Sequence, residues 1–421
     1  MLMGTVDTIL LGHLSATALA AGALGHMVSI TLLMLCTGVL WALDPLVAQA
    51  FGADDRPAIS AHLQRGIVLA AALTVPITLA MWDTRPLLRL LGQQPEVLDQ
   101  TGAYIRAISW GNLPYLLFGV FRQTLQAMSR VRPAMVGIII GNLVNVVANY
   151  ALIFGHFGSP ALGVAGSAYA SAAARWVMFL CLLLSGRRML RPYWNGFTAA
   201  AVSLRHHARL LRLGLPIGLH NSLELCTFLT VSLLMGQMGI PELAGHQIAI
   251  NLIALAFMIP LGISGAATTR VGNAIGRGDM PGARRSAVIC LLVGAGVMTI
   301  FATLFATVPR LLSGFYTEDT ATLAVAAALL PIAAVFQVFD GVQVVSAGVL
   351  RGAADTTVPA AIALLGFWLL GIPGGWYLAF REGLGPRGLW WGLTLGLSTV
   401  AVMFVTRIVF RFRSEIAREL G

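Results

Sequence analysis

The chain has 421 residues, of which 57% are hydrophobic and only 10% are charged. A soluble domain carries roughly 25% charged residues, so this chain could not cover a water-exposed surface of its size. Together with a mean hydropathy of +0.83, the composition excludes a soluble enzyme, a disordered protein and a secreted disulfide scaffold. It predicts a polytopic membrane protein.

Long runs rich in Leu, Ala, Ile, Val and Gly predict helices rather than strands, because a membrane-spanning helix needs roughly 20 apolar residues. We expect an all-α fold with twelve transmembrane helices, the first of which, over 1–12, is truncated. The other eleven are expected over 27–50, 66–82, 101–128, 134–155, 162–186, 211–238, 244–269, 286–312, 322–350, 357–380 and 388–410.

The two halves of the chain repeat each other. Val47-Ala-Gln-Ala-Phe-Gly is followed 224 residues later by Val271-Gly-Asn-Ala-Ile-Gly. This offset predicts two pseudo-symmetric six-helix lobes, an N-terminal lobe over 1–186 and a C-terminal lobe over 213–421, joined by a cytoplasmic linker over 187–212. The first helix lacks about a dozen residues relative to its repeat partner, so we expect either that the true start lies upstream or that this chain is truncated.

All 27 basic residues are arginines, and most lie in the loops after the even-numbered spans and in the C-terminal tail. The positive-inside rule places these segments in the cytoplasm, as in a multi-pass protein of a bacterial inner membrane. The net charge of +10 then reflects topology, and we expect no nucleic-acid partner. The four cysteines lie inside apolar spans, so they predict neither disulfides nor a metal site.

Ionisable side chains inside membrane spans are costly and usually functional. Asp340 lies in the middle of the tenth span, with Gln337 and Gln343 three residues to either side on one predicted helix face. A carboxylate between two amides suits a proton, a sodium ion or an organic cation. The alternative is a polar contact that only packs the helices.

Glu224 lies in the middle of the seventh span, and His220 precedes it by one turn. A buried glutamate suits proton exchange, whereas a purely structural Glu–His pair is the alternative. The sixth span contains Arg175, which needs a partner that the sequence does not identify. No P-loop, H-E-x-x-H or G-x-S-x-G pattern occurs, so we expect neither an enzyme nor a bound cofactor.

Polar residues also occur in the first and fifth spans. Asp7 would lie within the membrane if its helix continues upstream, or would otherwise be a polar residue near the N-terminus. Asn142, Asn145 and Asn149 share one helical face, which favours either a binding site or contacts between helices. Ser171 in the sixth span is a weaker candidate, because small residues there more often pack.

Several segments together resemble transporters of the multidrug and toxic compound extrusion (MATE) family. They are Val6-Asp-Thr, Pro45-Leu-Val-Ala-Gln-Ala-Phe-Gly, Asn145-Val-Val-Ala-Asn and Gly341-Val-Gln-Val-Val-Ser-Ala-Gly. The resemblance, closest to the NorM-type branch, implies a monomer with twelve helices in two lobes. It also implies export of cationic amphipathic molecules in exchange for Na⁺ or H⁺ across the lipid bilayer.

The resemblance further implies roles for individual residues. Asp7, Glu224 and Asp340 match the acids of the first, seventh and tenth helices, with Na⁺ possible at the last two. Asn145 matches a polar residue of the fifth-helix cation site, and Asn149 stands where another branch carries Asp. The alternative function is a lipid-linked saccharide flippase of the same superfamily, which more often has a basic central cavity.

Overall fold

The computed structural model describes residues 2–84, 86, 89, 95–194, 196–414 and 416. Every regular element in this part of the chain is a helix. This is expected because a helix in hydrocarbon satisfies its own backbone hydrogen bonds, whereas an open strand edge would not. Contacts divide the chain into two compact units, one of Met1–Leu43 with Arg56–Gly218 and one of Asp44–Asp55 with Leu219–Gly421.

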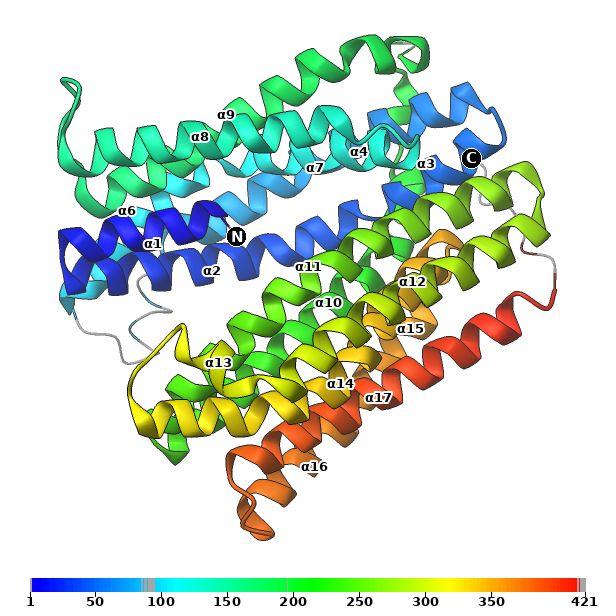
Figure 1. The fold of residues 1–421 in the computed structure, drawn as a ribbon. Helices are drawn as coiled ribbons and strands as arrows, with labels where there is room; N and C mark the ends of the chain where they lie inside the picture. Colours follow the sequence, from blue (N-terminus) through cyan, green and yellow to red (C-terminus); the bar gives the residue numbers. More distant parts are fainter. Residues whose placement is uncertain are drawn as a thin grey trace. The chain divides into compact units, whose positions relative to one another are not determined.

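The first unit is a bundle in which α1 packs on α2 and α8, and α9 packs on α6, α7 and α8. Helices α8 and α9 run side by side (Figure 1). Ser15 begins α2 as its N-cap, because its Oγ accepts a hydrogen bond from Ala18 N at 3.0 Å. The bounds are α1 (Leu2–Leu14), α2 (Ala16–Leu40), α4 (Arg56–Trp82), α6 (Pro95–Ser109), α7 (Asn112–Ala127), α8 (Arg132–Phe154) and α9 (Gly163–Leu190).

The second unit is organised around α14, which packs against α11, α12 and α17. Asp319 caps the start of α14 by accepting from Thr322 N at 2.8 Å. The bounds are α3 (Leu43–Gly52), α10 (Leu204–Met238), α11 (Ile240–Arg277), α12 (Met280–Thr307), α13 (Pro309–Gly314), α14 (Thr320–Gly352), α15 (Thr357–Ala363), η3 (Leu364–Gly371), α16 (Ile372–Trp376), η4 (Tyr377–Arg381) and α17 (Pro386–Arg411). Helix α10 begins in the first unit and continues into the second.

The predicted fold class is confirmed: the chain is an all-α polytopic membrane protein. Ten helices among the described residues are long and apolar enough to cross a membrane. The other two of the twelve predicted spans are not among these ten helices, for separate reasons. Helix α1 has only 13 residues, and the span predicted over 101–128 is broken at Trp110 and Gly111 into α6 and α7.

Two predicted boundaries look different in the structure. Residues Asp44–Asp55 cluster with the second unit, because Gln49 Nε2 donates to Gly352 O at 3.0 Å and Gly52 lies against Asn273. The segment predicted as a linker over 187–212 is largely helical. It contains the end of α9, η1 (Arg191–Tyr193), η2 (Ala199–Val202) and the start of α10.

Candidate functional site

In the first unit, the Asp7 carboxylate is buried and accepts three hydrogen bonds from neutral side chains. Its Oδ1 accepts from Asn149 Nδ2 at 2.7 Å and from Asn145 Nδ2 at 3.2 Å. Its Oδ2 accepts from Ser171 Oγ at 2.8 Å. Helices α1, α8 and α9 therefore meet at one carboxyl group. Its oxygens accept hydrogen bonds from these three side chains, none of which carries a positive charge that could neutralise a carboxylate.

Two further oxygens lie beside this carboxylate. The side-chain carbonyl oxygens of Asn145 and Asn149 are buried and have no hydrogen-bond partner in the described part of the chain. Carboxylate and amide oxygens are the ligands that hard cations prefer. The Asp7 cluster, defined as Asp7, Asn145, Asn149 and Ser171, thus offers a cation both charge and free oxygen acceptors.

Ser171, a weaker candidate from the sequence alone, belongs to the Asp7 cluster. The structure shows it donating to Asp7 and accepting from Asn145 Nδ2 at 3.0 Å. A lone serine in a helix of small residues has no pattern that reveals such a contact.

The first unit also contains a buried cation. Arg175 lies one turn after Ser171 on α9 and is only 8% exposed. Its guanidinium carbon lies 4.9 Å from the centre of the Tyr115 ring, so the partner that the sequence could not identify is aromatic. Its aliphatic stem packs over Gly111, where an added Cβ would meet Arg175 Cδ at 2.8 Å.

In the second unit, the two predicted acids lie near each other. Glu224 on α10 and Asp340 on α14 are close enough for their carboxyl groups to interact electrostatically. Gln343 bonds to Glu224 and also to His220, with 3.2 Å between Gln343 Nε2 and His220 Nε2. Because the amide nitrogen is a donor, His220 Nε2 accepts and the ring proton resides on Nδ1.

Gln337 faces a different neighbour from Gln343. Its Nε2 lies 3.8 Å from Met298 Sδ on α12, whereas Gln343 contacts α10. Six residues turn a helix by about 240° beyond a full turn, so the two side chains cannot point to one partner helix. Asp340 Oδ1 and both glutamine Oε1 atoms are buried without a hydrogen-bond partner among the described residues.

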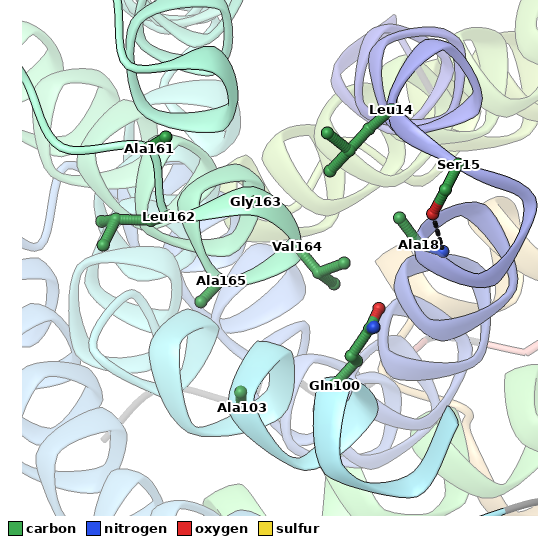
Figure 2. Close-up of a pocket in the computed structure, with 10 residues that line it drawn as sticks. All are labelled: Leu14, Ser15, Ala18, Gln100, Ala103, Ala161, Leu162, Gly163, Val164 and Ala165. Carbon is green, nitrogen blue, oxygen red and sulfur yellow. Dashed lines mark hydrogen bonds between the residues drawn. The ribbon is translucent and has the colours of Figure 1, made fainter. Parts of the chain in front are cut away.

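A separate pocket of about 390 Å³ lies in the first unit (Figure 2). It is lined by small and apolar side chains together with the amide of Gln100 and the capping Ser15. None of the predicted site residues lines it. Its lining is Leu14, Ser15, Ala18, Gln100, Ala103, Ala161, Leu162, Gly163, Val164 and Ala165.

Several solved structures have the same fold. The eukaryotic MATE transporter AtDTX14 matches with a TM-score of 0.87 at 22% identity, covering 97% of this chain and 91% of that one. A MOP superfamily transporter from Pyrococcus furiosus Vc1 (DSM3638) matches with a TM-score of 0.84 at 19% identity. The match covers 98% of this chain and 94% of that one. An outward-facing multidrug resistance MATE family transporter matches with a TM-score of 0.85 at 19% identity, and this match also covers 98% of this chain and 94% of that one.

Membership of a family is established by sequence. The model of the MatE family matches residues 1–151 and 216–377, which together make up well over half of the chain. The matched residues include three members of the Asp7 cluster, namely Asp7, Asn145 and Asn149. They also include Glu224 and Asp340. The chain belongs to the MATE family of membrane transporters.

Proposed function

We propose that this protein is a secondary active antiporter that exports cationic amphipathic compounds in exchange for Na⁺ or H⁺. The observation that carries the proposal is the proximity of Glu224 and Asp340 inside the second unit. Two carboxyl groups that interact electrostatically inside a helix bundle, Asp340 buried and Glu224 half-buried, cannot both hold a charge at low cost unless a cation joins them. A proton, a sodium ion or an organic ammonium group would each relieve this repulsion.

The Asp7 cluster supports a second cation-binding position in the first unit. Its carboxyl group accepts hydrogen bonds from neutral side chains, and the free amide oxygens of Asn145 and Asn149 complete a set of oxygen ligands. If the coupling ion and the exported cation compete for these carboxyl groups, loading one favours release of the other. An ion gradient then drives export, provided that each ligand binds the inward- and outward-open states with different affinity.

The experiment is efflux of a fluorescent organic cation from proteoliposomes, with an imposed Na⁺ gradient in one set and a proton gradient in another. Wild type should export the dye under one of the two gradients, which identifies the coupling ion. Asp7→Asn, Glu224→Gln and Asp340→Asn should each abolish gradient-driven efflux while the protein stays folded. Glu318→Gln is the matched control, because Glu318 is an exposed acid between α13 and α14.

Normal efflux by both Glu224→Gln and Asp340→Asn would refute the role of the acid pair. A wild type that exports no dye under either gradient, yet moves a lipid-linked saccharide between leaflets, would favour the flippase instead. The acids inside the helix bundles favour the antiporter, because a flippase for a pyrophosphate-linked lipid more often has a basic cavity, whose cations bind the phosphate groups.

We further propose that the protein resides as a monomer in a bacterial inner membrane with its C-terminus in the cytoplasm. The orientation rests on the asymmetric distribution of arginine among the loops, and the monomeric state is what the family resemblance implies. A green fluorescent protein fused to the C-terminus should fluoresce, and alkaline phosphatase fused there should be inactive. The opposite pair of results would invert the topology.

A further inference from the structure

The segment that joins α9 to α10 concentrates positive charge that the proposed export function does not use. Six arginines and no acidic residue lie over 187–212, and no acidic residue occurs between Asp99 and Glu224. Arg187 and Arg188 are exposed in the last turn of α9. Neither forms an ion pair within the described part of the chain, so both guanidinium groups are free to bind an anion.

These arginines continue an apolar surface of α9. Leu180 and Leu184 are exposed, and together with Arg188 they follow one another at intervals of four residues on one helical face. Exposed leucines of a membrane-spanning helix face the acyl chains of the lipids. Arg188 therefore lies where this face leaves the hydrocarbon, at the depth of the phospholipid headgroups.

The loop after α9 holds two aromatic rings outward. Trp194 and Phe197 are 39% and 61% exposed, and their ring centres lie 5.2 Å apart in an edge-to-face contact. An exposed aromatic pair is unfavourable in water, whereas tryptophan is enriched at the interface between membrane and water. The pair thus favours a position at the membrane surface over a position in the aqueous phase.

Gln64 of α4 fixes this loop to the first unit. Its side chain is buried, and its Nε2 donates to Gly196 O. Its Oε1 accepts from Thr198 N at 3.0 Å and from Thr198 Oγ1 at 3.2 Å. Gly196 has a φ of +77°, which glycine adopts without strain. Because Gly196 lies between the two aromatic residues in the chain, this clamp holds their rings in the exposed position.

We propose that the end of α9 and the loop around Gly196 form a binding site for anionic phospholipids. The phosphate groups contact Arg187 and Arg188, whose guanidinium groups can bind phosphate through two parallel hydrogen bonds. An acyl chain lies along Leu184, and Trp194 and Phe197 lie at the interface beside the headgroup. In the orientation proposed above, this is the cytoplasmic leaflet. The inference does not depend on what the protein transports.

The first measurement is binding of phosphatidylglycerol and of phosphatidylcholine to the purified protein in detergent, by native mass spectrometry. Each arginine near an anionic lipid contributes about fivefold in affinity, so Arg187→Gln/Arg188→Gln should weaken phosphatidylglycerol binding by roughly tenfold or more. Binding of phosphatidylcholine, which has no net charge, should change by less than about twofold. Arg381→Gln/Arg387→Gln is the charge-matched control, because it removes two exposed arginines from the second unit.

The second measurement locates the aromatic loop by fluorescence in proteoliposomes. The lipids carry bromine either near the ester end of the acyl chains or near the chain terminus. The emission of Trp194 is the difference between wild type and Trp194→Phe. Bromine near the ester end should quench this emission more strongly than bromine at the chain terminus, because an interfacial indole lies at headgroup depth.

Three results would overturn the proposal. One is equal affinity of wild type for the two lipids, and another is an equal loss in the two double variants, since either would remove the specific role of Arg187 and Arg188. Trp194 emission that neither set of brominated lipids quenches would place the loop in water. Displacement of phosphatidylglycerol by soluble glycerol phosphate or by an oligonucleotide would also overturn it, in favour of a soluble polyanion.

Discussion

Asn149 and Asp7 are 142 residues apart in the chain, yet Asn149 Nδ2 donates to Asp7 Oδ1 at 2.7 Å. The same amide nitrogen also donates to Asn145 O at 2.9 Å. One residue thus ties the carboxylate of α1 to α8. The contact makes the position of α1 dependent on a hydrogen bond to a charged group.

Replacing Asn149 should therefore loosen the first unit. Asn149→Ala removes one of the three donors to Asp7 and should lower the free energy of unfolding by about 1.5–3 kcal/mol. The measurement is the thermal unfolding midpoint in detergent micelles. Asn142→Ala is the control on the same helix, because Asn142 Nδ2 donates within its own helix, to Ile138 O. If the two variants unfold at the same temperature, the Asp7 contact contributes nothing to stability.

A second prediction concerns a hydrogen-bonded histidine in the second unit. Trp390 Nε1 donates to His246 Nδ1 at 3.1 Å, and His246 Nε2 lies 2.8 Å from Ser232 Oγ. Because the indole is only a donor, His246 is neutral with its proton on Nε2. Trp390→Phe leaves Nδ1 buried and unsatisfied, which should cost about 1–3 kcal/mol of unfolding free energy.

The control for this variant is the next residue of α17. Trp391 is 41% exposed, so Trp391→Phe should change the unfolding free energy by no more than about 0.5 kcal/mol. Chemical denaturation of both proteins in the same detergent gives the comparison. An equal effect of the two substitutions would show that ring volume, and not the bond to His246, determines the outcome.

A third prediction concerns the close approach of two helical segments. A Cβ added at Gly392 of α17 would meet Gly375 Cα at 2.2 Å and Gly371 O at 2.6 Å. Both neighbours are backbone atoms, which cannot move aside as a side chain would. Gly392→Ala should therefore destabilise the protein by about 1–3 kcal/mol.

Gly296→Ala is the matched substitution, because a Cβ at Gly296 meets no atom within 4 Å and alanine favours helix. It should be neutral or stabilising by up to about 1 kcal/mol. The measurement is the thermal unfolding midpoint of each variant, which should fall for Gly392→Ala and stay the same or rise for Gly296→Ala. A tolerated Gly392→Ala would mean that α17 is not packed as closely against α16 and η3 as the structure has it.

A fourth prediction concerns pH. The hydrogen bonds from the side chain and backbone of Thr322 hold the pKa of Asp319 below its ordinary value of 3.8. Since the folded pKa is the lower one, this cap stabilises the protein above about pH 4 and is lost as the pH falls through the lowered value. The difference in unfolding temperature between wild type and Asp319→Ala should be present at neutral pH and shrink in acid.

Asp319→Asn separates the charge from the cap. Asparagine retains an oxygen acceptor for Thr322 N but does not titrate. The stability of this variant should therefore depend less on pH than that of wild type over the acidic range. If wild type and Asp319→Asn lose stability in parallel as the pH falls, the carboxylate of Asp319 is not the titrating group.

The sequence by itself determined the class of the protein and the positions of its buried acids. An apolar run of sufficient length must form a helix in a bilayer, and a charged residue inside such a run is costly wherever it occurs. Both are local properties, so Asp7, Glu224 and Asp340 could be identified without coordinates. The repeat and the family resemblance likewise depend only on the order of residues.

Only the tertiary structure decided which side chains meet. Ser171 and Asn149 reach Asp7 because α1, α8 and α9 pack with particular faces together, and helical periodicity does not define the rotation of one helix against another. The same rotation turns Gln343 to His220 and Gln337 to Met298. Contacts between distant segments also placed residues 44–55 with the second unit, because packing follows space and not chain order.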